Sequence, residues 1–354
     1  MSKNKSFLII NPFGIGDVLF STPLIRNIKE KLPGSKVFYL CNQRSYPVLK
    51  DNPLIEKCFI YERDEFEAIR KQSRIAWIKK FLEFVSDIRR EKVDTVLDLS
   101  LNSQFGFLSF IAGIKERVGY DYKRRGRFLT KRIKFSGYKD KHVIEYYLDL
   151  LRIINIEPRH KKIELFLDSD QKEIANRDKL KIIMVPGGGA SWGGQAYRKH
   201  WDKAGFAQLA DRLIEELGAK VIISGSDQEK GIVDEVASLM CNRPDKAVDM
   251  ELSKFLNLLN NAELLIANDG GPIHMAVGLG LKTVSIFGPV DEKVYGPYPL
   301  DDSRHIVIKK DISCRPCYIN FKLPECMHDI MCLKDIDVDE VFKAAEKLLA
   351  GKDK

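Results

Sequence analysis

Asp17 stands at a place in the sequence where an acidic side chain could do chemistry. It ends the segment 11–17 (NPFGIGD), which follows a short apolar run and precedes a helical pattern. Gly14 and Gly16 allow close approach of the backbone, and the start of a helix favours the ionised form of a carboxylate. Asp17 is therefore a candidate general base, and a simple helix cap is the alternative. Because a third glycine is missing, the segment is weak support for a dinucleotide site.

A second glycine-rich segment, 186–190 (PGGGA), follows the apolar run 181–185. Its glycines, Gly188 and Gly189 among them, expose backbone N–H groups that can bind a diphosphate. No Gly-Lys-Ser/Thr follows at the spacing of a Walker A loop. Arg198 and Lys199 follow closely enough to reach the same phosphates. The alternative is that both cations are solvated beside a core tryptophan.

The segment 267–274 (ANDGGPIH) is the most informative in the chain. Asp269 can cap a helix, Gly270 and Gly271 leave their amides free, and the proline presets the first helical turn. The predicted helix N-terminus is thus suited to an anion. His274 falls one turn further along, where it either lies beside a ligand or is a buried structural residue.

Four of the seven cysteines fall within 19 positions: Cys314, Cys317, Cys326 and Cys332. In a cytoplasmic chain, such clustering favours metal-bound or free thiols over disulfides. The spacing could close a tetrahedral structural site around Zn or Fe, with reduced, unliganded thiols as the alternative. The remaining three, Cys41, Cys58 and Cys241, are expected to be buried small residues.

The excess of positive charge is local. The chain carries 58 Lys and Arg against 50 Asp and Glu, a net charge of +8, and the stretch 115–134 alone has nine basic and two acidic residues. Its basic residues include Lys123, Arg124, Arg125 and Arg127. A polyanion or a phospholipid surface is the expected partner, and a solvated face without a partner is the alternative. Nucleic acid is disfavoured because no zinc-finger, helix-turn-helix or RNP pattern accompanies the patch.

The composition is that of a globular protein, with 44% hydrophobic and 31% charged residues. These values argue against a disordered or collagenous chain. No apolar run reaches the roughly 18 to 20 residues that cross a bilayer. The first apolar run, 7–10, is too short for a secretory signal, so a cytoplasmic protein is expected.

Strand patterns alternate with helical patterns, which predicts parallel sheets. The pattern runs through a first half, with strands over 7–11, 36–41 and 95–99, and restarts at residue 181. We therefore expect an α/β protein of two Rossmann-like domains that face one another across a cleft. The expected domains are 1–168 and 169–335, with a junction near 168–180. The amphipathic last helix, about 338–349 within the segment 336–354, could pack on either domain, and packing back on the N-terminal one is the expectation.

Three segments together resemble glycosyltransferase family 9, the ADP-heptose:lipopolysaccharide heptosyltransferases. They are Gly16-Asp17-Val18, Lys199-His200-Trp201 and the late segment 269–274, in matching order and spacing. The resemblance implies the GT-B architecture, with the acceptor bound mainly by the N-terminal domain and the nucleotide sugar by the C-terminal one. It also implies peripheral contact with the cytoplasmic face of the inner membrane.

The resemblance also implies roles for individual residues. On the acceptor side these are Asp17 as catalytic base beside Gly16, and His142 behind the basic stretch. On the donor side they are Lys199 and the glycines 270 and 271 at the diphosphate, Glu229 at the ribose, Met250 at the adenine and Asp269 at the sugar. Two positions depart from the family. Gly270 replaces a Thr or Ser, which removes a hydroxyl, and Asp202 replaces a Pro.

The expected reaction is an inverting, metal-independent sugar transfer. Asp17 would take a proton from an acceptor hydroxyl as its oxygen attacks the anomeric carbon of an ADP-heptose or related sugar. Lys199, Arg198 and the amides of Gly188, Gly189, Gly270 and Gly271 would meet the charge of the leaving diphosphate. The alternatives are an NAD-dependent oxidoreductase and a non-catalytic protein that binds sugar nucleotides or a lipid surface.

Overall fold

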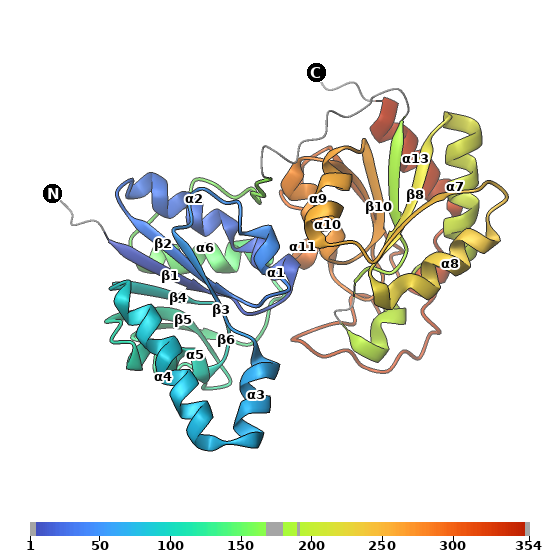
Figure 1. Ribbon diagram of the computed structural model, residues 1–354. Helices are drawn as coiled ribbons and strands as arrows, with labels where there is room; N and C mark the ends of the chain where they lie inside the picture. Colours follow the sequence, from blue (N-terminus) through green and yellow to red (C-terminus); the bar gives the residue numbers. More distant parts are fainter. Residues whose placement is uncertain (1–4, 168–179, 190–191, 351–354) are drawn as a thin grey trace. The chain divides into compact units, whose positions relative to one another are not determined.

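A computed structural model describes residues 5–167, 180–189 and 192–350 of the chain (Figure 1). It divides into two compact units. Unit 1 consists of Met1–Tyr138 and Val143–Lys162, and unit 2 of Lys139–His142 and Ile163–Lys354. The expected junction near 168–180 falls almost wholly outside the described residues. The short segment 139–142 belongs to unit 2, which the sequence did not predict.

Unit 1 is built on a six-stranded parallel sheet with the order β3-β2-β1-β4-β5-β6. The strands are β1 (Ser6–Ile10), β2 (Lys36–Cys41), β3 (Lys57–Ile60), β4 (Thr95–Asp98), β5 (Glu116–Tyr122) and β6 (Lys131–Phe135). From the β1–β4 pair, which is parallel, successive strands are added toward one edge through β2 and β3 and toward the other through β5 and β6. In open parallel sheets, ligands bind outside the carboxyl ends of the strands at such a switch point.

Helices cover both faces of this sheet. On one face lie α1 (Ile15–Phe20), α2 (Thr22–Lys31) and α6 (Val143–Ile153), and on the other α3 (Arg63–Gln72), α4 (Arg74–Arg90) and α5 (Ser103–Ile111). A short 3-10 helix, Tyr46–Val48, follows β2. The helical pattern that follows Asp17, over 18–32, forms two helices separated at Ser21, whose hydroxyl donates to the Val18 carbonyl (2.7 Å). Pro23 then occupies the first turn of α2, so the chain starts a new helix.

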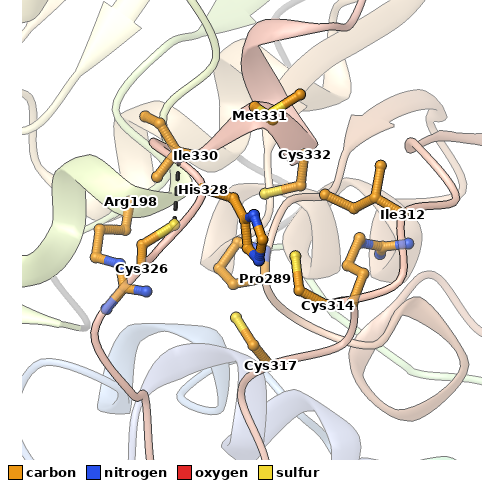
Figure 2. A pocket seen from close by; sticks show the side chains of 11 residues that line it. Arg198, Pro289, Ile312, Cys314, Cys317, Cys326, His328, Ile330, Met331 and Cys332 are labelled. Carbon is orange, nitrogen blue, oxygen red and sulfur yellow. Dashed lines mark hydrogen bonds between the residues drawn. The ribbon is translucent and has the colours of Figure 1, made fainter.

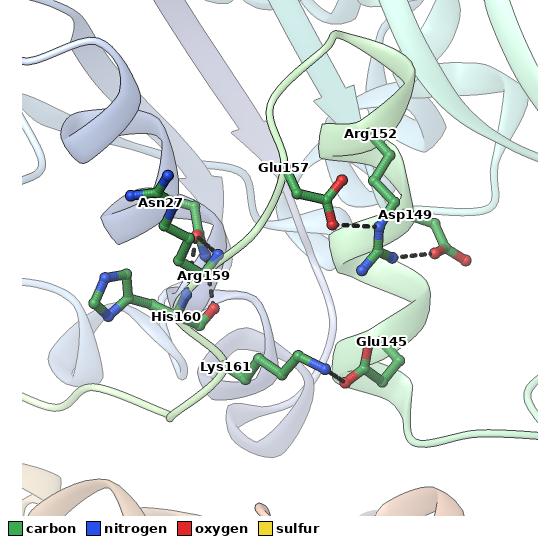
Figure 3. A network of polar contacts seen from close by, with 8 residues as sticks. All are labelled: Asn27, Glu145, Asp149, Arg152, Glu157, Arg159, His160 and Lys161. Carbon is green, nitrogen blue, oxygen red and sulfur yellow. Dashed lines mark hydrogen bonds and ion pairs between the residues drawn. The ribbon is translucent and has the colours of Figure 1, made fainter.

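The segment 159–161, which follows α6, forms polar contacts with α2 and α6 (Figure 3). The Asn27 side chain of α2 accepts from the backbone N–H groups of Arg159 (2.6 Å) and His160 (3.1 Å) and donates to the His160 carbonyl (2.7 Å). Lys161 pairs with Glu145 of α6 at 2.7 Å. Asn27 is 3% exposed, so its polar atoms are satisfied by this segment and by the Pro23 carbonyl rather than by water.

Unit 2 repeats the same topology, with the sheet order β12-β11-β10-β7-β8-β9. Its strands are β7 (Lys181–Val185), β8 (Lys220–Gly225), β9 (Asp245–Val248), β10 (Leu264–Asn268), β11 (Lys282–Ile286) and β12 (His305–Ile308). All neighbours pair in parallel, and the switch point lies between β7 and β10. The predicted α/β class with two parallel sheets is confirmed.

The helices of unit 2 are α7 (Lys203–Leu217), α8 (Lys230–Leu239), α9 (Leu252–Asn260), α10 (Gly271–Leu279), α11 (Glu292–Tyr295), α12 (Met331–Lys334) and α13 (Val338–Ala350). Two 3-10 helices, η3 (Gly193–Lys199) and η4 (Asp227–Glu229), precede α7 and α8. Helices α9 and α10 pack together, and α10 lies on β10 and β11. Among the helices of the described residues, none is long and apolar enough to cross a membrane.

Helix α13 packs within unit 2, against α7, β11 and β12. Its apolar residues Val341, Phe342 and Ala345 belong to the same buried cluster as the inner face of α7. The guanidinium of Arg212 in α7 lies 3.9 Å from the centre of the Phe342 ring. The expectation that the last helix packs back on the N-terminal domain is therefore wrong, because its apolar face complements α7.

Candidate functional site

The loops after β7 and β10 touch through their backbones at the switch point of unit 2. A Cβ atom on Gly270 would lie 1.7 Å from the carbonyl oxygen of Gly188, so only glycine fits there. Gly188 itself has φ +72°, in the left-handed region that favours glycine. The departure from the family at position 270 thus has a local cause, because the Gly188 carbonyl occupies the space of a side chain.

Asn268, the last residue of β10, holds this arrangement together. It is fully buried, and its side-chain amide donates to the Pro186 carbonyl (2.5 Å) and accepts from the Trp201 N–H (3.1 Å). One side chain of β10 therefore contacts both the residue after β7 and the backbone N–H of Trp201, which lies between η3 and α7. Sequence reasoning missed Asn268, although an amide directly before the acidic Asp269 at a strand end was a readable signal.

Lys199 and Asp269 form a buried ion pair beside these loops. The Lys199 Nζ lies 2.8 Å from an Asp269 carboxylate oxygen, and the two side chains are only 9% and 6% exposed. The ammonium also stands 4.3 Å from the centre of the Trp192 ring. An ammonium has three N–H donors, so a pair with one carboxylate leaves capacity for an anionic ligand. Two residues predicted at the donor site thus come together in the structure.

Glu229 braces the glycine-rich loop. One carboxylate oxygen accepts from the Gly189 N–H (2.7 Å), and the other accepts from the N–H and hydroxyl of Ser226 (2.9 and 2.7 Å). A Cβ atom on Gly187 would lie 2.1 Å from this carboxylate. The Gly189 amide, predicted to face a diphosphate, is therefore bonded to Glu229 in this structure. Met250, predicted to contact adenine, is half-buried between β9 and α9.

His274 lies in the first half of α10, which begins at Gly271, and is 4% exposed. Burial, and secondarily the Lys199 cation, lower the pKa of His274 to about 3. The imidazole is therefore neutral at pH 7 and adds no positive charge to the site. Burial also lowers the pKa of His200, so Lys199 is the cation that this segment presents beside Asp269.

In unit 1, Asp17 lies in the first turn of α1, directly after the carboxyl end of β1. The loop before it is held by Asn11, which donates to the Asp17 carbonyl (2.9 Å), and by Asn42, which donates to the carbonyls of Pro12 and Phe13 (3.0 and 2.8 Å). The Asp17 side chain is half-buried and Gly16 precedes it in the helix. Burial, together with the charge of Asp17, raises the pKa of Tyr138.

Asp98 is an acidic residue at the same edge of the sheet that sequence reasoning did not single out. It ends β4, pairs in register with Ile10 of β1 and is 5% exposed. Burial raises its pKa to about 6, although the carboxylate accepts from the Ser100 N–H (2.9 Å) and hydroxyl (2.6 Å). The sequence TVLDLS could have indicated this residue, because a single acid ends an otherwise apolar strand.

The basic stretch forms β5, β6 and the loop between them. Lys123, Arg124, Arg125 and Arg127 lie in this loop and are all exposed. His142 is instead buried in unit 2, where its Nε2 is 3.0 Å from the Gly296 carbonyl oxygen and its ring centre is 4.5 Å from that of Tyr298. The structure therefore places the predicted acceptor residues in different units.

The four clustered cysteines line one pocket of about 20 Å³ (Figure 2). His328 and Arg198 line it as well. Arg198 is 3% exposed, donates to the Pro324 carbonyl (2.6 Å), and has no hydrogen-bond partner at Nε. Burial raises the pKa of Cys332 to about 11, whereas hydrogen bonds, first that from the Ile330 N–H (3.3 Å), lower the pKa of Cys326.

All seven cysteines are free thiols. Within the described residues, no three His, Cys, Asp or Glu side chains stand in an arrangement that could hold a metal ion as placed. Arg198, predicted at the donor diphosphate, is found at the thiol pocket. Cys41 is buried and Cys58 half-buried, but Cys241 is exposed, contrary to expectation, because it lies just beyond the end of α8.

Two six-stranded parallel sheets of the same strand order in one chain match the GT-B fold of solved heptosyltransferases. The chain belongs to glycosyltransferase family 9 (heptosyltransferase), whose model matches residues 81–328. It is a glycosyltransferase of that family, as the resemblance predicted.

Individual relatives agree with this assignment. A lipooligosaccharide heptosyltransferase 2 of Campylobacter jejuni is 23% identical over 352 residues, 96% of each chain. The crystal structure of a family 9 glycosyl transferase from Veillonella parvula matches with a TM-score of 0.79 and 22% identity, covering 98% of this chain and 97% of that one. The E. coli heptosyltransferase WaaC with ADP matches with a TM-score of 0.73 and 14% identity, covering 97% and 99%.

Proposed function

We propose that this protein transfers a heptose from ADP-heptose, with inversion, to a hydroxyl of a lipopolysaccharide inner core or a similar phosphorylated, lipid-linked glycan. The Lys199–Asp269 pair carries the proposal, because it places a cation on Asp269, the residue that precedes Gly270 and whose backbone lies against Gly188, in a chain of this family. The name of the C. jejuni relative and the ADP in the WaaC structure support the substrate class.

The donor site is proposed at the switch point of unit 2. The N-terminus of α10, with Gly270 and Gly271, meets the diphosphate together with Lys199, which moves part of its interaction from Asp269 to the ligand. Asp269 then contacts the sugar, and Glu229 and Met250 contact the nucleoside. The N–H groups at the start of α10 and the Lys199 ammonium are fixed by the fold, so they can stabilise the leaving diphosphate with little reorganisation.

The acceptor site is proposed in unit 1. Asp17 removes the proton from the attacking hydroxyl, and Gly16 permits close approach of the acceptor. The exposed cations of the β5–β6 loop bind phosphates of the glycan core. His142, which is buried, takes part by positioning the segment that joins the units.

The transfer is tested with ADP-heptose and a purified heptose-free lipid core as acceptor. The expected result is release of ADP with formation of a glycoside whose anomeric configuration is opposite to that of the donor. Retention of configuration would contradict the inverting mechanism but not the proposal that ADP-heptose is the sugar donor. Binding of ADP-heptose without release of ADP, with several core acceptors, would favour the non-catalytic alternative.

The thiol pocket is proposed as a structural metal site for Zn or Fe that takes no part in the transfer. Its four thiols and one imidazole are soft ligands that suit such ions, once their side chains turn inward. A metal bound to thiolates is negatively charged overall, and the buried Arg198 with its unpaired Nε supplies a balancing cation. We therefore assign Arg198 to this pocket rather than to the diphosphate.

Elemental analysis of the purified full chain tests the metal site. One equivalent of Zn or Fe is expected in the native protein, and Cys314→Ser/Cys317→Ser should lose it. Cys241→Ser is the matched control, because Cys241 is exposed and outside the pocket. A metal-free native protein with wild-type activity would leave these residues as reduced thiols.

A further inference from the structure

Unit 1 exposes a row of apolar side chains on helix α4. Ile75, Ile78 and Leu82 follow one another at a spacing of three and four residues, so they lie on one side of the helix. They are 82%, 49% and 52% exposed. Figure 1 shows α4 on the same side of the unit 1 sheet as α3 and α5. Three adjacent exposed aliphatic residues on one helix face are unusual for a surface that meets only water.

A series of aromatic rings continues this row across α5. Trp77 stacks on Phe81 (5.4 Å between ring centres), and Phe81 lies 6.4 Å from Phe107. Phe107 and Phe110 of α5 then approach Phe128 in the β5–β6 loop at 5.1 and 6.0 Å. Phe107 and Phe110 are 39% and 54% exposed. Ring contacts therefore connect the exposed residues of α4 with those of α5 and the basic loop, through Phe81, which is itself buried.

Cations border the far end of this series. Arg127 stands 4.7 Å from the centre of the Phe128 ring, and Arg117 stands 5.5 Å from that of Phe110. Lys123, Arg124 and Arg125 are exposed in the same loop. In the described part of the chain, none of the four loop cations, Lys123, Arg124, Arg125 and Arg127, forms an ion pair. Their charges are available to an external anionic surface.

We infer that this surface docks on an anionic lipid bilayer. We call it the α4–α5 face, made of Ile75, Ile78, Leu82, Phe107, Phe110, Phe128 and the loop 123–127. Its aliphatic and aromatic side chains enter the interface between headgroups and acyl chains, and its unpaired arginines and lysines contact lipid phosphates. Aromatic rings covered by arginine suit this boundary, because one side is apolar and the other is charged. The inference rests on the proposed lipid-linked acceptor for its biological purpose.

Binding of the full chain to vesicles of phosphatidylcholine, with and without phosphatidylglycerol, tests the inference. The wild type should bind the anionic vesicles and leave the neutral ones largely free, with an affinity that falls as salt rises. Ile75→Ser/Ile78→Ser/Leu82→Ser should weaken the partition on the order of tenfold or more. Arg124→Ala/Arg125→Ala should weaken it about fivefold for each cation removed, on anionic vesicles only.

Leu239→Ser/Leu300→Ser is the matched control, because these two leucines of unit 2 are 51% and 56% exposed and lie outside the face. Its binding should equal that of the wild type. Brominated lipids should also quench Trp77, and Trp77→Phe should remove that part of the quenching. Unchanged vesicle binding by the α4 triple variant would overturn the inference. It would also be overturned if the wild type did not bind vesicles but formed a concentration-dependent dimer that the triple variant abolishes.

Failure of this inference and failure of the proposed function give different results. The α4 triple variant should keep its turnover on a soluble acceptor fragment, because none of its residues belongs to the proposed catalytic or binding machinery. Vesicle binding without any turnover would contradict the function alone. Turnover without vesicle binding would contradict the α4–α5 face alone.

Discussion

At the scale of single residues, two acids at the switch point of unit 1 have different chemistry. Asp17 is half-buried at the start of α1, where the helix dipole favours its charge. Asp98 is buried at the end of β4, where desolvation disfavours its charge. Asp98 therefore exchanges its proton in a mildly acidic range.

Asp17→Asn should lower turnover by about 10² to 10⁴ because the amide cannot take up the acceptor proton. Stabilisation of the variant by ADP should remain that of the wild type, since Asp17 lies in unit 1 and the proposed donor site in unit 2. Initial rates at saturating donor, beside a thermal melt with ADP, provide the measurement. A variant that transfers sugar at the wild-type rate would remove Asp17 from the mechanism.

Asp98→Asn should change how stability depends on pH. The folded pKa of about 6 lies above the ordinary value of 3.8, so the folded protein binds this proton more tightly than the unfolded chain. The contribution of protonated Asp98 to the free energy of unfolding is fully present below about pH 4. It falls as the pH rises and is lost above about pH 6. The wild type should therefore lose stability that the variant keeps, so the stability of Asp98→Asn minus that of the wild type should be on the order of 3 kcal/mol larger at pH 7 than at pH 4.

Urea unfolding of wild type and Asp98→Asn at several pH values checks this expectation. Asp64→Asn on the exposed side of α3 serves as the control, and its difference from wild type should vary far less between pH 4 and 7. Parallel pH curves for wild type and Asp98→Asn would show that the folded protein does not retain this proton.

At the scale of elements, the loops after β7 and β10 form one structural unit. Asn268 contacts the chain after β7 and after η3, Glu229 supports the Gly189 amide, and Gly188 takes the space beside Gly270. Asp202, the second departure from the family, is the N-cap of α7 and accepts from the Gly205 N–H at 3.1 Å. An aspartate in place of proline therefore has a local structural role.

Gly270→Ser would restore the hydroxyl that is usual in the family at this position. It should nevertheless destabilise the protein by about 1–3 kcal/mol and weaken ADP binding, because its Cβ meets a backbone carbonyl that cannot rotate away. Gly231→Ser in α8 is the control, since no atom lies within 4 Å of its added Cβ. Chemical denaturation and ADP titration of both variants test the predicted losses of stability and ADP affinity. Tighter ADP binding by Gly270→Ser would refute the expectation.

At the scale of the whole molecule, two units with the same strand order carry different chemistry at their switch points. Unit 1 presents the carboxylates of Asp17 and Asp98 there and an exposed basic loop between β5 and the edge strand β6, whereas unit 2 presents a cation, glycines and a helix N-terminus. This division supports an acceptor site in the first and a donor site in the second. It also disfavours a dinucleotide at Gly14 and Gly16.

ADP should stabilise the full chain, by about 2.7 kcal/mol at a concentration one hundred times its Kd, whereas NAD should not. Differential scanning calorimetry with each ligand provides the comparison, with AMP as the control that lacks the second phosphate. A shift with NAD and none with ADP would favour the oxidoreductase alternative.

Patterns along the chain were enough to predict the α/β class, the two repeated halves, and the importance of the segments around Asp17, Lys199 and Asp269. Periodicity and glycine placement are local properties, so they can be read along the chain. The folded chain was needed to show that Arg198 lines the thiol pocket, that the last helix packs on α7, and that position 270 has room only for glycine. These outcomes depend on contacts between residues far apart in the chain, such as Gly188 with Gly270, which no local pattern encodes.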